Sequence, residues 1–426
     1  MAATEQAADG RGDRVDGAAA RRSPAGPAVV WAATRLVLLL WVFKVYVFPG
    51  PDVTSDVSVI YQGWYDVLRH GSFPRTDVTW QYPPAAALAI LSPGLLPFLD
   101  YPSAFFVLAC AADLAVLVLL LRAGRRPGRT PRGAWVWVAG VPLLGPTVYA
   151  RYDVMVTAVA VAALLAGLRR PRLMGVLTGF GALLKGWPVL LLTGAARRRS
   201  WAAAGATAAG IGALAALVLP GAFTFLTFQR DRGTEVESLG ALVFHVARHF
   251  GWHGQVLLNY GSVEFLGPHV DLVSTVALAL TGAAFGWLLL WRLAARRLAA
   301  PHTLAEAAFT AVLMFVTTSR VISPQYLVWL VGVAAVCRCF PRSRMRLPIW
   351  LVLAAAFVTV LEFPVYFADV VASTPRGVAL LVLRNGLLVT ATVLAARHLW
   401  RSTVPRPPAA TLPDQTARAQ EPSVSS

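Results

Sequence analysis

Residues 54–84, TSDVSVIYQGWYDVLRHGSFPRTDVTWQYPP, form a polar and aromatic segment within a chain that is otherwise strongly apolar. The segment carries aspartates, arginines, a histidine and Trp and Tyr rings, and it follows the first long apolar run. Its apolar side chains recur at helical spacing, at Val57, Ile60, Tyr61, Trp64 and Leu68. This spacing predicts an amphipathic helix over residues 56–70, with Gly71 as its left-handed cap. Because Trp and Tyr favour membrane interfaces, we expect this helix to lie on a membrane surface.

The composition of the whole chain indicates a membrane protein. The 426 residues are 57% hydrophobic and only 14% charged, whereas soluble domains are about 25% charged. Apolar runs recur from Val29 to Leu399, and each is long enough to cross a hydrocarbon core of about 30 Å. We therefore predict an all-α polytopic membrane protein. Arg35 and Lys44 in the first run are expected to extend their charged ends toward the membrane surface.

The net charge of +17 is concentrated in short basic clusters between apolar segments. Examples are RAGRRPGRTPR at residues 122–132 and RCFPRSRMR at residues 338–346. This is the pattern of cytoplasmic loops, in which Lys and Arg orient a membrane protein. The basic residues therefore predict membrane topology, and no nucleic-acid partner is expected.

The basic clusters also predict how the chain crosses the membrane. Residues 28–49 leave the cytoplasm, so residues 51–101 form a first outer loop. Residues 83–99 are expected to form a helix in the outer interface that Pro93 and Pro97 break. Residues 102–121 then return to the cytoplasm.

Residues 173–194 are flanked by arginines at both ends, which predicts two half-spans meeting near Lys185, Gly186 and Pro188. Further spans are expected at 134–150, 153–168, 201–220, 271–291, 303–319, 325–338, 347–363 and 378–396. This gives about 12 transmembrane segments over residues 28–399, with a large outer loop at 221–270. Residues 1–27 and 400–426 have the composition of disordered tails, both on the cytoplasmic side.

Several motifs resemble a known enzyme family. Asp56 opens the predicted surface helix, and an aromatic YPP follows at residues 82–84. GVLTGFGALLKGWPVLLL at residues 175–192 and SPQYLVWLV at residues 323–331 follow in order and spacing. Together they resemble the GT-C membrane glycosyltransferases, and within these glycosyltransferase family 87, the polyprenol-phosphate-mannose-dependent mannosyltransferases. Some relatives carry a histidine pair where this chain has Gln325 and Tyr326.

The resemblance implies a GT-C-like bundle with a pair of juxtamembrane helices on the outer face. It implies an inverting transferase that moves a sugar, with mannose as the family expectation, from a polyprenyl-phosphate donor. The acceptor would be a glycolipid or cell-envelope glycan on the outer face of the cell membrane. No cofactor and no metal site are predicted, although the residues do not exclude a divalent metal ion. The sequence does not decide the sugar, the acceptor or the linkage, and a multi-span transporter or flippase is the alternative function.

The expected chemistry assigns roles to individual residues. A sugar on a lipid phosphate already has a good leaving group, so one general base is enough, and Asp56 is the candidate. The alternative for Asp56 is a helix cap together with Thr54 and Ser55. Phosphate needs fixed cations where negative charge develops, and the candidates are Arg320, Lys185 and Arg151. The candidate substrate-binding residues are Tyr61, Tyr82, Asp153, Gln325 and Tyr326.

Some of these residues have a structural alternative. Lys185 lies within a half-span, where a lysine is costly, so it could either bind phosphate or pair with a carboxylate. Arg151 and Asp153 could form an ion pair, and Arg384 is expected to pair with Glu362 or Asp369. His245, His249 and His253 follow at i, i+4 and i+8, which fits a metal-ligand face, an interfacial helix or an acceptor contact.

Overall fold

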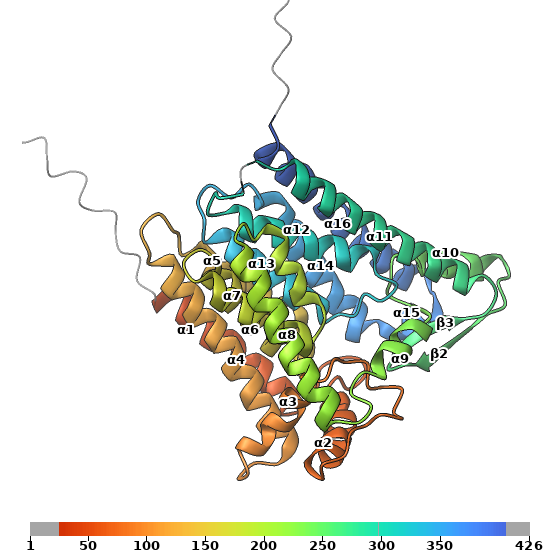
Figure 1. Cartoon of the computed structure of the whole chain (residues 1–426). Coiled ribbons are helices and arrows are strands. Elements are labelled where there is room, and N and C mark those ends of the chain that lie inside the picture. Colours follow the sequence, from red (N-terminus) through yellow and green to blue (C-terminus); the bar gives the residue numbers. More distant parts are fainter. Residues whose placement is uncertain (1–24, 297, 406–426) are drawn as a thin grey trace, which may run out of the picture.

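The computed structural model describes residues 25–296 and 298–405. Most of the two predicted disordered tails lies outside these residues, but the described residues 25–27 and 400–403 are helical rather than disordered. The described chain is a helical bundle that carries a small sheet at one end (Figure 1). Its α-helices are α1 (Ala25–Val42), α2 (Gln62–Arg69), α3 (Ala86–Leu91), α4 (Tyr101–Gly124), α5 (Arg132–Gly140), α6 (Asp153–Gly167), α7 (Pro171–Leu184), α8 (Arg198–Val218), α9 (Phe225–Asp231), α10 (Leu242–Ala247), α11 (Val270–Ala294), α12 (Thr303–Thr318), α13 (Tyr326–Arg338), α14 (Arg346–Val360), α15 (Phe367–Ala372) and α16 (Pro375–Thr403). Short 3₁₀ or π segments are η1 (Asp56–Tyr61), η2 (Ser92–Leu95), η3 (Pro142–Val148), η4 (Trp187–Gly194), η5 (Arg248–Phe250) and η6 (Leu361–Val365). The strands are β1 (Thr234–Glu235), β2 (Gln255–Asn259) and β3 (Ser262–Leu266).

The described residues contain six helical segments long and apolar enough to cross a membrane. These are α1, α4, α8, α11, α14 with η6, and α16. Shorter apolar helices accompany them: α3 with η2, α6, α7, α12 and α13. The all-α polytopic class is confirmed, and the number of about 12 crossing segments stays a prediction.

The helices predicted for the membrane surface are present. Residues 56–69 are helical as η1 and α2, and Gly71 follows with a left-handed φ of +77°. Their predicted apolar face is buried at Val57, Tyr61, Trp64 and Leu68. The next element, α3, is only 6 residues long, whereas α4 runs unbroken for 24 residues. Figure 1 shows α2 and α3 together at one end of the bundle, away from the described ends of the chain.

The predicted interruption near Lys185 is also present. Helix α7 ends at Leu184, Lys185 is extended with φ −164° and ψ 91°, and Pro188 follows in η4. On α7, Gly175 and Gly179 lie so close to α8 that a Cβ atom on either would meet a backbone oxygen at 2.3 or 2.4 Å. The glycines of the GVLTG segment therefore allow these two helices to pack tightly.

Two expected spans are not continuous helices. Residues 134–150 divide into α5, which ends at Gly140, and η3, which begins at Pro142, and within η3 the chain kinks again where Gly145 takes a left-handed φ of +61° before Pro146. Residues 347–363 divide into α14 and η6, where Pro364 has no N–H to continue the helix and Phe363 is extended. In both places a proline redirects the chain.

A three-stranded antiparallel sheet lies in residues 221–270, the predicted outer loop, where no strands were predicted. Strand β3 is central and pairs with β1 and β2. The turn between β2 and β3 has left-handed φ values of 47° at Tyr260 and 77° at Gly261, as a tight two-residue hairpin requires. The glycine at the turn was the available sequence signal.

A buried ion pair fastens α1 to α4, and it corrects the expectation for Arg35. The Arg35 side chain is 1% exposed, and its Nε lies 2.8 Å from Oδ2 of Asp113, a carboxylate in the middle of α4. Asp113 also accepts hydrogen bonds from the indoles of Trp31 and Trp137 and from the Tyr149 hydroxyl. Because the carboxylate is present inside the bundle, Arg35 pairs with it and does not extend to the surface.

This network gives a stability prediction. Arg35→Met should lower the free energy of unfolding by about 3–5 kcal/mol, because it leaves the buried Asp113 carboxylate without its cation. The double variant Arg35→Met/Asp113→Asn should be more stable than Arg35→Met alone, since the asparagine is neutral and still accepts from the indoles. Thermal unfolding in detergent measures both. Equal melting of the single and double variants would contradict a stabilising role for the pair.

Candidate active site

A cavity of about 320 Å³ lies where residues 79–83, the break after α7, the small sheet and the start of α13 meet. Five of the residues predicted to bind substrate or phosphate line it: Tyr82, Lys185, Arg320, Gln325 and Tyr326. These residues come from three distant parts of the sequence. The fold therefore brings together most of the predicted site.

Lys185 is held at the cavity wall by a carboxylate. Its Nζ lies 2.8 Å from both carboxylate oxygens of Asp153, the first residue of α6. Asp153 accepts a third hydrogen bond from the indole nitrogen of Trp329 at 2.7 Å. Lys185 therefore pairs with a carboxylate, which is one of the two alternatives expected for it. Asp153 does not line the cavity and lies behind Lys185.

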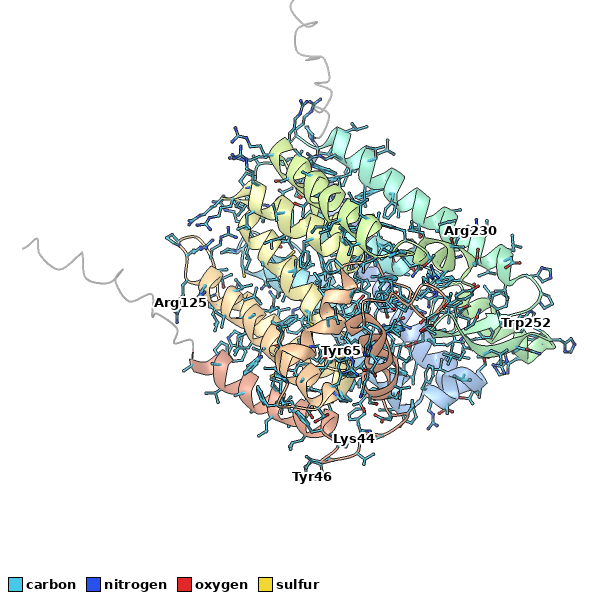
Figure 2. All side chains as sticks on the ribbon, turned by 60° about the horizontal axis from the view of Figure 1, so that its bottom comes forward. Lys44, Tyr46, Tyr65, Arg125, Arg230 and Trp252 are labelled. Atoms are coloured by element: carbon cyan, nitrogen blue, oxygen red, sulfur yellow. The ribbon has the colours of Figure 1, made fainter. Side chains whose placement is uncertain are left out.

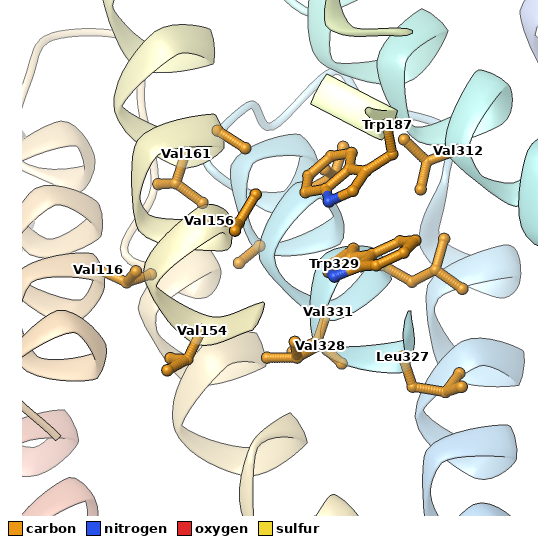
Figure 3. Close-up of a cluster of buried hydrophobic side chains, with 14 of the residues drawn as sticks. Val116, Val154, Val156, Val161, Trp187, Val312, Leu327, Val328, Trp329 and Val331 are labelled. Carbon is orange, nitrogen blue, oxygen red and sulfur yellow. The ribbon is translucent and has the colours of Figure 1, made fainter. Parts of the chain in front are cut away.

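Aromatic rings surround the Lys185 ammonium. Its Nζ lies 5.1 Å from the ring centre of Tyr82, 4.9 Å from that of Tyr152 and 5.5 Å from that of Trp329. Trp329 stacks on Trp187 with ring centres 5.2 Å apart, as Figure 3 shows. These electron-rich faces hold a cation in a site with little access to water.

Asp56 and Arg151 form a second ion pair. The Arg151 Nη2 lies 2.8 Å from Oδ2 of Asp56, and its Nη1 donates to the carbonyl oxygens of Val53 and Ala150. The Asp56 side chain is 32% exposed, and Oδ1 accepts no hydrogen bond from the described residues. Asp56 does not act as a helix cap here, and Arg151 pairs with it rather than with Asp153.

Tyr82 connects the two ion pairs. It lines the cavity, and its hydroxyl lies within electrostatic range of Asp153, Asp56 and Arg151. Burial raises the pKa of Tyr82 to about 12, with a smaller contribution from the two carboxylates, so the phenol is protonated at neutral pH. It can therefore donate a hydrogen bond toward the cavity.

Arg320 differs from the other cations because it has no ion pair within the described residues. Its guanidinium donates to the carbonyl oxygens of Gln229 and Arg230 and to the Ser274 hydroxyl at 3.2 Å. These neutral partners orient the group without cancelling its charge. Arg320 therefore offers the cavity an uncompensated positive charge.

The remaining predicted residues take different places. Gln325 and Tyr326 line the cavity at the start of α13. Tyr61 lies in the buried aromatic cluster behind Tyr82 and Tyr152, and its hydroxyl has no hydrogen-bond partner among the described residues. Tyr61 does not line the cavity, so its role in substrate binding stays a prediction.

Comparison with known proteins identifies the family. The sequence profile described as Glycosyltransferase family 87 matches residues 80–324, which is more than half of the chain. The protein belongs to glycosyltransferase family 87. The matched residues include Tyr82, Lys185 and Arg320, so the resemblance noted in the sequence is confirmed. The protein is therefore a membrane glycosyltransferase, and the alternative of a transporter or flippase loses its support.

The solved structure of ArnT from Cupriavidus metallidurans bound to undecaprenyl phosphate is similar over 89% of this chain and 78% of that chain, with 16% sequence identity and a TM-score of 0.42. A comparison with curated proteins gives no match.

The family 87 cavity contains a third cation that sequence reasoning did not single out. Arg232 lines it, and its Nε lies 3.2 Å from Oε1 of the buried Glu264 on β3. Glu264 also accepts from the Gly233 backbone N–H and the Asn259 amide, so it orients this part of the loop. An arginine in a loop has no distinctive sequence signal, and only the sheet places it at the cavity.

Glu235 positions the segment that carries Arg320. It accepts hydrogen bonds from the backbone N–H of Ile322 at 2.6 Å and from the Ser323 hydroxyl at 2.8 Å. Its own N–H donates to the Arg320 carbonyl oxygen at 3.0 Å. Burial raises the pKa of Glu235, while Arg232 opposes that shift. The side chain thus fixes the SPQY segment against β1.

The three histidines do not form a metal face. His245 is buried, its Nε2 donates to the Val236 carbonyl oxygen, and its Nδ1 accepts from the Ser373 hydroxyl. Since both ring nitrogens are used, His245 anchors α10 to the turn before α16. Within residues 25–296 and 298–405, no group of three His, Cys, Asp or Glu side chains could hold a metal ion.

Variants of the Lys185–Asp153 pair can distinguish a structural role of Lys185 from a contact with substrate. Lys185→Met should lower the free energy of unfolding by about 3–5 kcal/mol, because it leaves a buried carboxylate unpaired. Lys185→Met/Asp153→Asn should recover most of this loss, since Asn still accepts from Trp329. If the Lys185 ammonium also contacts substrate, the double variant should melt normally and still transfer sugar poorly. A double variant that regains both stability and transfer would show that Lys185 acts through Asp153 alone.

Proposed function

We propose that this family 87 protein is an inverting glycosyltransferase that uses a polyprenyl-phosphate sugar, with mannose as the first candidate. The sugar would pass to a lipid-linked or cell-envelope glycan on the outer face of the membrane. The observation that carries the proposal is the cavity in which Arg320 supplies an unpaired cation, next to a cluster in which Asp56 keeps one free carboxylate oxygen.

The cation fits the phosphate of a lipid-linked donor. When the bond from the anomeric carbon to the phosphate oxygen breaks, the phosphate gains negative charge. Arg320 is held by two carbonyl oxygens and a hydroxyl, so its guanidinium is oriented before the donor arrives. Arg232 and Lys185 add charge beside it but are each paired with a carboxylate. Arg320 is therefore our principal candidate for the phosphate ligand.

Asp56 fits the general base. Its Oδ2 is held by Arg151, which fixes the carboxylate, while Oδ1 is left to accept a proton. In the proposed step the acceptor hydroxyl oxygen attacks the anomeric carbon, and Asp56 takes the hydroxyl proton. The bond to the phosphate breaks on the opposite face, so the sugar configuration inverts and the polyprenyl phosphate leaves. The leaving phosphate needs no protonation, and a second carboxylic acid is unnecessary.

The Asp56 assignment gives the direct test of this function. Asp56→Asn keeps the shape of the side chain but cannot accept the proton, so turnover should fall by about 10²–10⁴. The assay is transfer from radiolabelled polyprenyl-phosphate-mannose in detergent, with the melting temperature measured on the same sample. Asp66→Asn is the matched control, because Asp66 lies on the adjoining helix α2 in an exposed pair with Arg69. Near-normal transfer by Asp56→Asn would remove Asp56 from the mechanism.

The outward orientation of the site gives a second test. Cysteines placed at Ser72 or Gln255, both exposed near the cavity end of the bundle, should react with a membrane-impermeant thiol reagent on intact cells. A cysteine at the exposed Arg126, in the α4–α5 connection, should react only after the cells are opened. The parent chain with its own three cysteines gives the background. The reverse labelling pattern would place the cavity on the cytoplasmic side and contradict an outer-face acceptor.

A further inference from the structure

A second hollow, of about 440 Å³, lies between α5, α13 and α14. Three arginines line it: Arg132 at the start of α5, Arg338 at the end of α13 and Arg346 at the start of α14. None of the candidate active-site residues lines this hollow, and Tyr326, which shares α13 with Arg338, lies at the opposite end of that helix. It is therefore a separate feature of the molecule.

The three arginines have no countercharge in the described part of the chain. None of their side chains makes a hydrogen bond or an ion pair with residues 25–296 or 298–405. Arg338 is partly buried, and the guanidinium groups of Arg132 and Arg346 lie within electrostatic range of it. Arg132 and Arg346 are exposed, so their charges are open to a ligand from outside the chain. Three unpaired like charges around one hollow indicate that an anion from outside the chain completes it.

The surroundings of the hollow match the headgroup depth of a membrane. The indoles of Trp135 and Trp350 line it and are 44% and 60% exposed, which is typical of rings at the membrane interface. Gly26, at the start of α1, lies against Trp135, so the hollow is at the end of the bundle where the described chain begins. Its remaining lining is apolar, including Ile349 and Leu353 on α14. A ligand that is anionic at one end and apolar at the other fits this arrangement.

We propose that this hollow binds an anionic phospholipid, with its headgroup phosphodiester among Arg132, Arg338 and Arg346 and its acyl chains along α5 and α14. Basic pockets between membrane helices on the cytoplasmic side are suited to anionic headgroups. Arginine is suited to phosphate because its planar fork donates two parallel hydrogen bonds. A soluble phosphate compound would match the charge but would leave the apolar lining unused. The lipid would also tie together three helices from distant parts of the sequence, without taking part in sugar transfer.

The experiment measures lipid binding to the delipidated full chain in a neutral detergent. Native mass spectrometry and the melting temperature are recorded with phosphatidylglycerol, with phosphatidylcholine and with glycerol 3-phosphate. Phosphatidylglycerol should bind and raise the melting temperature, and the other two should do so weakly or not at all. The variant Arg132→Gln/Arg338→Gln/Arg346→Gln should bind phosphatidylglycerol roughly 100-fold more weakly, the loss expected from three arginine contacts at a membrane surface.

The control variant removes the same charge from the same end of the bundle. Arg125 and Arg126 lie in the α4–α5 connection, and Arg342 lies in the α13–α14 connection. All three are exposed, and none lines the hollow. Figure 2 shows Arg125 projecting from the edge of the molecule. Arg125→Gln/Arg126→Gln/Arg342→Gln should keep the affinity of the parent chain. Equal losses in the two triple variants would mean a diffuse surface charge and would overturn the site.

Two further outcomes decide against the proposal. Equal binding of phosphatidylcholine would show that the charge is not recognised, and competition by glycerol 3-phosphate at similar concentration would indicate a site for a soluble anion. If the triple variant does not fold, the exposed Arg346→Gln alone should weaken phosphatidylglycerol binding by roughly fivefold. An unchanged affinity in this single variant would contradict a contact between Arg346 and the phosphodiester.

Discussion

The ion pair between Lys185 and Asp153 joins the parts of the molecule that make the cavity. It connects the break after α7 to the first residue of α6, and through the Trp329 indole it reaches α13. A buried lysine is costly unless its charge is paired, and a buried carboxylate carries the same requirement. Each of the two residues therefore offsets the cost of burying the charge of the other. The aromatic rings around the ammonium follow from the same need, because their faces stabilise a cation that water does not reach.

Some of the buried and partly buried arginines pair with carboxylates and stabilise the fold, whereas Arg320 has no carboxylate partner among the described residues. Arg35, Arg384 and Arg232 each face a buried carboxylate, and they hold helices or the small sheet in place. Arg320 is bound by neutral oxygens and keeps its charge for the cavity. Because compensated cations attract an anion only weakly, the pattern of pairing identifies where a phosphate is expected to bind.

The small sheet within residues 221–270 makes the cavity more rigid than a loop would be. Glu235 and Glu264 lie opposite each other on β1 and β3. One fixes the backbone of the segment that carries Arg320, and the other holds Arg232. A sheet with strands of only 2, 5 and 5 residues is thus sufficient to align two arginines from separate segments. Such pre-organisation lowers the cost of orienting charges during sugar transfer.

The sequence by itself determined the membrane class, the amphipathic helix at residues 56–69, the interruption at Lys185 and the family. These features depend on local pattern: hydropathy over a window, helical spacing of apolar residues, and prolines and glycines that end helices. The sequence also supplied most of the cavity residues, because charges within apolar segments are rare and therefore conspicuous.

Only the tertiary structure decided which charges are paired. Arg35 was expected at the membrane surface, and it is buried because Asp113 on α4 lies beside it, 78 positions along the chain. Asp56 pairs with Arg151 rather than capping its helix, and Arg232 joins the cavity through a sheet that was not predicted. Whether a cation serves structure or substrate depends on the carboxylate nearest to it in space. Electrostatic pairing acts over a few ångströms in the folded molecule, and separation along the chain does not determine it.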